Sequence, residues 1–135
     1  PLETVQMLCT AHWIHGNDAP YLPVHHKHPC TLWVAQTIEN YRLAWWLGYY
    51  LFKEFTYRYN NVHKSESVLY SVRCHPPAMT ARGYTKFPQA MPEEYKHHDV
   101  MVAYRDYYVG EKSGFAEWTG RPVPSFMQKD KHYGN

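Results

Sequence analysis

The chain is poor in cysteine, in net charge and in long apolar runs. It has only three cysteines, Cys9, Cys30 and Cys74, and this odd, widely spaced set disfavours a disulfide framework and suits a reducing compartment. The formal charge is only +2, so bulk charge alone does not indicate a nucleic-acid partner. Arg42 and Lys53 interrupt the best candidate for the about 18 apolar residues of a membrane span. We therefore expect a cytoplasmic protein without membrane segments.

Other patterns are absent as well. The sequence shows no internal repeat, no low-complexity tract and no period-two strand, and it has no glycine-rich phosphate loop and no Ser-His-Asp signature. Glu3 and His12 stand where the apolar core of a secretory signal would lie, so we expect no such signal. Aromatic residues make up 17% of the chain, which excludes a disordered protein. The sequence predicts one compact, all-α domain over residues 1–135.

The most informative segment is an aromatic stretch that predicts one long helix, over which the fold is built. Between Glu39 and Tyr59 formal charges are few, and at about 100° per residue Arg42, Tyr49, Lys53 and Asn60 form one polar stripe. Nearly every other direction is apolar, so we expect the remainder of the chain to cover this helix on most sides. We interpret its aromatic residues as core rather than as a base-stacking platform: Tyr41, Trp45, Trp46, Tyr49, Tyr50 and Phe52.

Shorter helices are predicted on both sides of the long one. Apolar residues at helical spacing indicate a helix from Leu2 to about Trp13, and Pro29 begins another that runs to about Thr37. The pair Asn60 and Asn61 ends the long helix, and a further short helix spans about 65–72. Asp99 is a good N-cap for a last main helix. Residues 74–98 are expected to form an irregular wrap, and residues 128–135 a frayed tail.

Several blocks of the sequence resemble a group of small phage proteins. The blocks are Leu2–Leu8, His28–Trp33, Asn40–Tyr41, Tyr57–Tyr59, His63–Ser65, Ala90–Pro92, Ala103–Arg105 and Glu111–Lys112 through Arg121–Pro122. That group in turn is distantly similar to the phage pyrimidine-dimer DNA glycosylases. The resemblance implies a compact helical enzyme that flips a nucleotide opposite the lesion out of double-stranded DNA. It also implies a nucleophilic α-amine and a glutamate on the first long helix.

The resemblance assigns catalytic roles to the start of the chain. Glu3 occupies the position of the family's glutamate, and the secondary amine of Pro1 would be the nucleophile. Two features depart from the family: the usual segment before this helix is missing, and an expected arginine is Gln6. The alternative is that upstream residues have been removed from the chain and that Glu3 only favours the helix N-terminus.

Basic residues supply candidate DNA contacts. The family's last helix and Arg-Pro tail correspond to Lys112 and Arg121, and Trp118 is a candidate for stacking on a base. The predicted phosphate contacts are Arg58, His63, Lys64, Arg105, Lys112 and Arg121. The alternative is a solvated surface with helical salt bridges, of which Glu54 with Arg58 at i,i+4 is one.

A histidine-rich region leaves a third class of function open. His25, His26, His28 and Cys30 lie close together in the sequence, but their spacing reproduces no known zinc pattern. We expect no metal and no cofactor; instead we expect surface histidines, or His28 as a cap of the helix that begins at Pro29. The sequence therefore predicts a DNA glycosylase/lyase. The alternatives are a non-catalytic nucleic-acid-binding protein of the same fold, and a His-rich metal-binding or interaction module.

Overall fold

The computed structural model describes residues 1–112, 114 and 116–127. Over this part of the chain the regular structure is helical and contains no strand, so the all-α prediction is confirmed. No helix among these residues has both the length and the apolar character needed to cross a membrane. The chain divides into two compact units, Pro1–Pro88 and Gln89–Asn135. The expectation of one domain over 1–135 stays a prediction, and the expected frayed tail lies outside the described residues.

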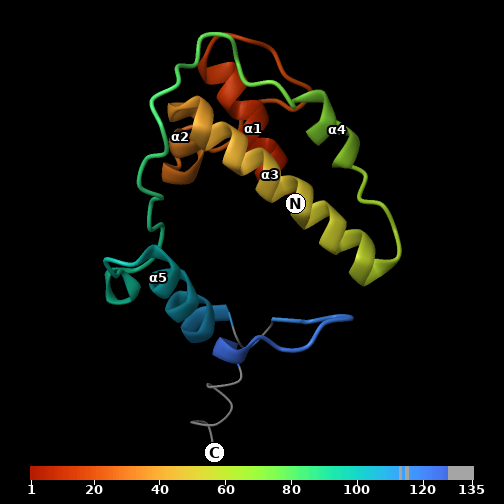
Figure 1. The fold of residues 1–135 in the computed structure, drawn as a ribbon, viewed down its shortest axis with the longest axis vertical. Helices are drawn as coiled ribbons and strands as arrows, with labels where there is room; N and C mark the ends of the chain where they lie inside the picture. Colours follow the sequence, from red (N-terminus) through yellow and green to blue (C-terminus); the bar gives the residue numbers. More distant parts are fainter. Residues whose placement is uncertain (113, 115, 128–135) are drawn as a thin grey trace, which may run out of the picture. The chain divides into compact units, whose positions relative to one another are not determined.

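The first unit contains four α-helices: α1 (Leu2–Ile14), α2 (Pro29–Gln36), α3 (Ile38–Tyr59) and α4 (Glu66–Ser71) (Figure 1). Their ends follow the local signals in the sequence. The His28 ring accepts a hydrogen bond from the Cys30 N–H, which confirms the predicted cap of α2. Thr37 adopts an extended conformation and its hydroxyl accepts from the Asn40 N–H, which separates α2 from α3. Asn60 ends α3 in the left-handed conformation, with φ 49°.

The core of the first unit lies between α3 and the three other helices. Tyr41 and Phe52 on α3 are fully buried, as are Leu8 on α1 and Leu69 on α4. Gly48 allows the close approach of these elements, because a Cβ placed there would lie 3.1 Å from Leu69 Cδ1 and 3.2 Å from Thr4 Cγ2. Both distances are shorter than ordinary van der Waals contact, so α1 and α4 pack on α3 across a position without a side chain.

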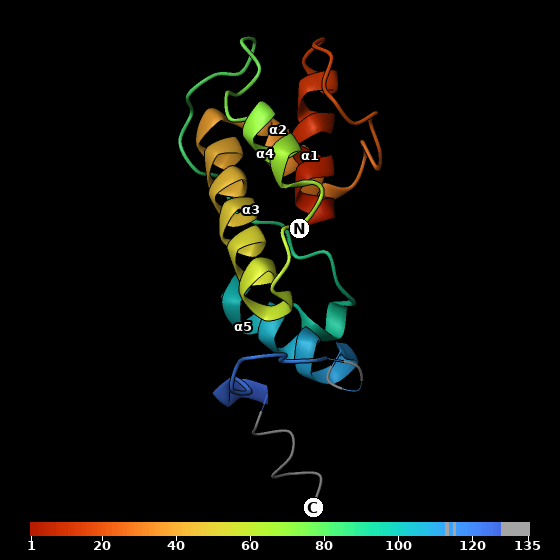
Figure 2. The same cartoon turned by 90° about the vertical axis from the view of Figure 1, so that its right-hand side faces the viewer.

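The prediction that α3 is covered on most sides is wrong. Figure 2 shows α1, α2 and α4 on one side of α3. On the opposite face Trp46 and Tyr50, two residues that the sequence assigned to the core, are more than half exposed. Trp45 and Tyr49 are partly buried, and the Trp45 indole N–H donates to the Leu69 carbonyl at 2.9 Å. The helix therefore has one apolar face inside the core and another on the surface.

The buried side chain of Asn40 on α3 forms hydrogen bonds both to α2 and to the irregular segment after α4. The Asn40 amide donates to the Trp33 carbonyl at 2.9 Å and to Thr85 Oγ1 at 2.8 Å, and its oxygen accepts from the Thr85 N–H at 3.1 Å. Nearby, the Trp33 indole donates to the Thr85 carbonyl and the Gly83 N–H donates to Glu39. These bonds explain how a segment without regular structure holds a fixed course.

A histidine and a tyrosine form a polar pair at the edge of the core. The Tyr41 hydroxyl donates to the Val72 carbonyl at 2.6 Å, so the His12 Nε2, at 2.8 Å from the hydroxyl oxygen, is its donor. Burial lowers the pKa of His12, an effect that the Cys74 carbonyl opposes and the charges of His75 and His15 reinforce. Burial also raises the pKa of Tyr41. The pair therefore favours a neutral imidazole and a neutral phenol.

The lowered pKa of His12 predicts loss of stability in acid. A histidine whose pKa is lower in the folded state contributes its full stability above the unfolded value of about 6.5, and loses it as pH falls below that value. We expect the urea concentration at the midpoint of unfolding to decrease as the pH is lowered from 7.5 to 5.5. His12→Gln keeps an N–H for the Tyr41 oxygen but binds no proton, so its pH dependence should be shallower. The matched control is His26→Gln, which makes the same change at an exposed histidine; equal slopes in both variants would contradict the assignment.

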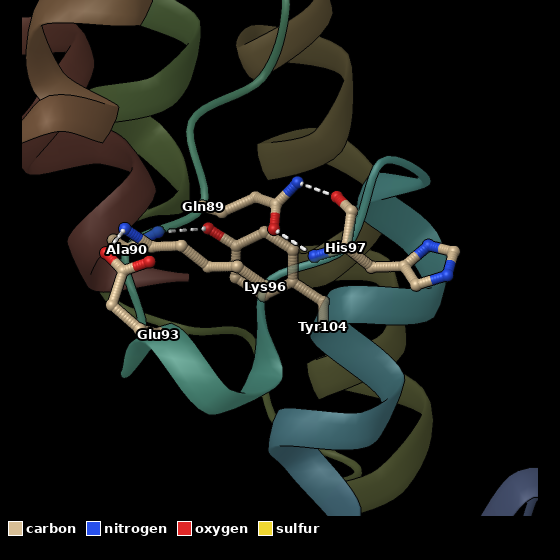
Figure 3. Close-up of polar contacts among 6 residues, drawn as sticks. All are labelled: Gln89, Ala90, Glu93, Lys96, His97 and Tyr104. Atoms are coloured by element: carbon tan, nitrogen blue, oxygen red, sulfur yellow. Dashed lines mark hydrogen bonds and ion pairs between the residues drawn. The ribbon is translucent and has the colours of Figure 1, made fainter.

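The second unit contains the 3₁₀ turn η1 (Glu93–Tyr95), helix α5 (Val100–Tyr107) and the π-helical turn η2 (Tyr108–Lys112). The predicted cap of α5 is confirmed, because the Asp99 carboxylate accepts from the Met101 and Val102 N–H groups. Figure 3 shows how the segment before α5 closes. The Gln89 amide bonds both the N–H and the carbonyl of His97, and the Ala90 N–H donates to the Tyr104 hydroxyl on α5 at 3.2 Å.

Candidate functional site

The predicted nucleophile lies at the N-terminal end of α1. Pro1 is the N-cap residue, and its carbonyl accepts from the Val5 N–H at 3.2 Å. Pro1 is partly buried, and this burial lowers the pKa of its α-amine below the ordinary value of 8.0, while the Glu3 carboxylate acts in the opposite direction. Burial is the larger effect. More of this amine is therefore unprotonated near neutral pH than an exposed α-amine would be.

Glu3 lines a cavity of about 360 Å³ on the surface of the first unit. Its walls come from the first turns of α1, from the loop after α1 and from the start of α2. The lining residues are Glu3, Gln6, Met7, Val24, His25, His28, Cys30 and Thr31. A volume of this size lies at the lower end of small-molecule pockets, about 300–1,000 Å³. One carboxylate, two imidazoles and one thiol thus surround a space that is large enough for a small ring.

The backbone conformation of the loop before α2 places His25 and His28 in the wall of the cavity. His25 has φ 48°, a left-handed conformation that is uncommon for a residue with a side chain, and its carbonyl accepts from the His28 N–H. His28 then caps α2 through Nδ1. The histidine cluster was visible in the sequence, but its meeting with Glu3 and Gln6 was not. Among the residues that the structure describes, no three His, Cys, Asp or Glu side chains are placed to hold a metal ion.

His63, a predicted phosphate contact, lies within electrostatic reach of the N-terminal amine. Its ring packs against Phe52 and Phe55, and its Nδ1 accepts from the Ser65 N–H at 3.0 Å. Burial lowers the pKa of His63, and the positive charge of the α-amine lowers it further. The imidazole is therefore favoured in its neutral form, in which it is a hydrogen-bond donor through Nε2 rather than a cationic phosphate contact.

The remaining basic candidates of the first unit differ in their surroundings. Arg58 forms the predicted i,i+4 pair with Glu54, with Nε 3.5 Å from the carboxylate oxygen. Lys64 is exposed to solvent. Lys53, on the same helix as Arg58, pairs with Glu66 at 3.3 Å. Of these side chains, Lys64 is the best placed to reach a phosphate.

In the second unit two of the predicted DNA contacts, Arg105 and Trp118, each lie beside an aromatic ring. The exposed Arg105 guanidinium lies 5.4 Å from the centre of the Phe126 ring, and Trp118 lies beside Tyr108 with ring centres 6.2 Å apart. Arg121 is exposed, and its N–H donates to the Trp118 carbonyl. Lys112 ends η2, and its side chain lies outside what the structure describes. Arg105, Trp118 and Arg121 thus belong to one unit, and Pro1, Glu3, Arg58, His63 and Lys64 to the other.

Comparisons of the chain with protein-family models, with curated proteins and with solved structures found no match. The resemblance to the pyrimidine-dimer glycosylases therefore stays a prediction from the sequence blocks.

Proposed function

We propose that this protein binds double-stranded DNA and releases a damaged or modified base through an imine to the Pro1 α-amine. The observation that carries the proposal is the partly buried α-amine, whose pKa is lowered by burial, with the Glu3 carboxylate within electrostatic reach. Imine formation needs an unprotonated amine, and an α-amine is the group that supplies one most readily near neutral pH. DNA repair by a phage-encoded protein would take place in the host cytoplasm, a reducing compartment that suits Cys9, Cys30 and Cys74, for which the structure shows no disulfide.

The reaction uses the amine and the carboxylate in sequence. The unprotonated Pro1 nitrogen attacks C1′ of the damaged nucleotide, the bond from C1′ to the base breaks, and the base leaves with the bonding electrons and takes up the proton that the amine loses. The nitrogen lone pair then opens the sugar ring: the bond from C1′ to the ring oxygen breaks, the oxygen takes up a proton from water, and an iminium ion forms between Pro1 and C1′. The Glu3 carboxylate stabilises the positive charge that develops on the sugar. The cavity beside Glu3 is the candidate space for a flipped nucleotide.

Borohydride trapping tests this chemistry. The protein, with Pro1 confirmed as its first residue by mass spectrometry, is mixed with duplex DNA that carries either ultraviolet dimers or an abasic site, and is then reduced. We expect a covalent adduct on the dimer substrate that maps to Pro1. A chain whose Pro1 nitrogen is blocked by acetylation has an amide in place of that amine and should give no adduct.

The other outcomes separate the alternatives. An adduct on abasic DNA alone shows only an accessible amine and contradicts base release. Absence of any adduct, together with DNA binding whose affinity falls steeply with salt, would identify a non-catalytic DNA-binding protein. Absence of both the adduct and DNA binding would exclude a DNA partner. It would leave the third alternative, a His-rich metal-binding or interaction module.

A further inference from the structure

Two short distances show where the start of α1 meets α3. The Nε2 of His12 lies 2.8 Å from the Tyr41 hydroxyl oxygen, and a Cβ placed on Gly48 would lie 3.2 Å from Thr4 Cγ2. The residue number falls along α1 as it rises along α3, so the two helices run antiparallel. Pro1 comes three residues before Thr4 and therefore lies about one turn beyond Gly48. Figures 1 and 2 both show the N-terminus beside the middle of α3.

The ring of His63 reaches the same level of α3 from the segment before α4. Phe52 follows Gly48 by about one turn, and its ring centre lies 5.2 Å from that of His63. The ring centre of Phe55 lies 4.8 Å from the imidazole. The positive charge of the α-amine lowers the pKa of His63, in agreement with this placement. The predicted nucleophile therefore has a histidine as a neighbour.

The surroundings of His63 favour its neutral form and determine which nitrogen carries the proton. Burial lowers its pKa, the charges of the α-amine and of Lys64 lower it further, and the Glu66 carboxylate opposes them. Nδ1 accepts from the Ser65 N–H at 3.0 Å, and a proton on this nitrogen would break that bond. The neutral ring therefore carries its proton on Nε2. Within the described part of the chain no group accepts from this N–H, so it is left for a ligand.

We propose that the Nε2–H of His63 donates to a phosphate oxygen next to the attacked sugar and so holds C1′ against the Pro1 nitrogen. This inference rests on the proposed function and names a residue that positions its substrate. Phosphate oxygens flank every sugar of a DNA strand, and hydrogen bonds to them fix the register of the strand on a protein. Attack by the amine requires that C1′ be held close to it and in the right direction.

A neutral donor suits this place better than a cation. The reaction develops positive charge on the sugar and then leaves an iminium ion at Pro1, and a lysine in place of His63 would put a second full charge beside both. An imidazole that carries its proton on Nε2 binds a phosphate oxygen without that repulsion. The exposed Lys64, the next residue in the chain, can supply the charge that attracts DNA. His63 thus contributes position, and Lys64 contributes attraction.

Two variants of His63 separate this role from a structural one. His63→Asn keeps an acceptor for the Ser65 N–H but lacks the Nε2–H, whereas His63→Gln keeps an N–H near the Nε2 position and loses that acceptor. We expect single-turnover base release from dimer-containing duplex DNA to slow by about tenfold to a hundredfold in His63→Asn, and by less in His63→Gln. His26→Asn makes the same change at an exposed histidine and should release the base at the rate of the unaltered chain.

The salt dependence of DNA affinity tests whether the contact is neutral. A cation that contacts phosphate displaces a counterion, so Lys64→Gln should lower the slope of log K against log salt by about one. His63→Asn should leave that slope unchanged near neutral pH, because an uncharged donor displaces no counterion. Far-UV circular dichroism confirms that every variant is folded.

The outcomes distinguish this inference from the proposed function. Slower release in His63→Asn than in His63→Gln, with an unchanged salt slope, supports the contact through Nε2–H. Release in His63→Asn at the unaltered rate would overturn it. So would a His63→Gln variant that is no faster than His63→Asn, which would show that the imidazole only holds Ser65. A salt slope lowered by about one in His63→Asn would overturn it too, since the contact would then be cationic. If the unaltered chain releases no base, the proposed function itself is contradicted and the inference falls with it.

Discussion

Replacing Glu3 by glutamine should lower the rate of base release from dimer-containing duplex DNA by about 100- to 10,000-fold, the range for a positioned acid or base group. The carboxylate lines the cavity of about 360 Å³, and its charge acts on the Pro1 amine. Glutamine retains the shape and the polarity but not the negative charge that opposes the developing sugar cation. The loss should appear in kcat, while DNA affinity stays unchanged or rises, because a negative charge near the phosphates has been removed.

The control is Asp18→Asn, which makes the same chemical change at an exposed position in the loop after α1. Single-turnover measurements of base release at several pH values compare the two variants with the unaltered chain. Loss of the glutamate also removes the charge that raises the pKa of the amine, so trapping at abasic DNA should persist at lower pH. Equal rates of base release in both variants would show that Glu3 only stabilises the N-terminus of α1.

Replacing Asn40 by leucine should destabilise the first unit by about 2–5 kcal/mol. Leucine has a similar volume, but it makes none of the three hydrogen bonds of the buried amide. The Trp33 carbonyl and the Thr85 N–H would then lose their partner, and each buried polar group left in this way costs about 1–3 kcal/mol. The segment around Thr85 has no regular structure of its own, so it should open before the helices do.

Urea unfolding and hydrogen exchange measure the two parts of this effect. The urea midpoint gives the global loss, and the exchange rate of the Thr85 N–H gives the local one. Asn61→Leu is the matched control, since Asn61 is exposed beyond the end of α3 and should change stability by less than about 0.5 kcal/mol. Unaltered protection of the Thr85 N–H in Asn40→Leu would contradict the role of the amide.

The helices of this chain could be predicted because their ends depend on a few neighbouring residues. Asp99 starts α5, His28 starts α2, and Asn60 ends α3, each through bonds or backbone angles within one turn. The covering of α3 could not be predicted in the same way. Helical spacing shows which sides of a helix are apolar, but Phe52 and Tyr50 are equally apolar by that measure. Which of them becomes buried depends on where α1, α2 and α4 pack.

The candidate site was predictable only in part for a similar reason. Glu3 and Pro1 are neighbours in the sequence, so their pairing follows from one turn of helix. The approach of His25 and Cys30 to Glu3 depends on the path of the loop after α1, including the left-handed conformation of His25. Histidine spacing carries no information on such a path. The Gln89 amide that holds His97 likewise gives no periodic signal.

The glycine at position 48 links the middle of α3 to the beginning of the chain. Thr4, which a side chain at this position would press against, is the residue directly after Glu3 and lies in the first turn that Pro1 caps. On the other side the same position faces Leu69 of α4, the helix that follows His63. An added methyl group would therefore require Thr4 Cγ2 or Leu69 Cδ1 to move by a few tenths of an ångström, and Thr4 belongs to the turn that carries the amine and the carboxylate. The middle of α3 therefore has little spare room on the side where it meets the beginning of the chain.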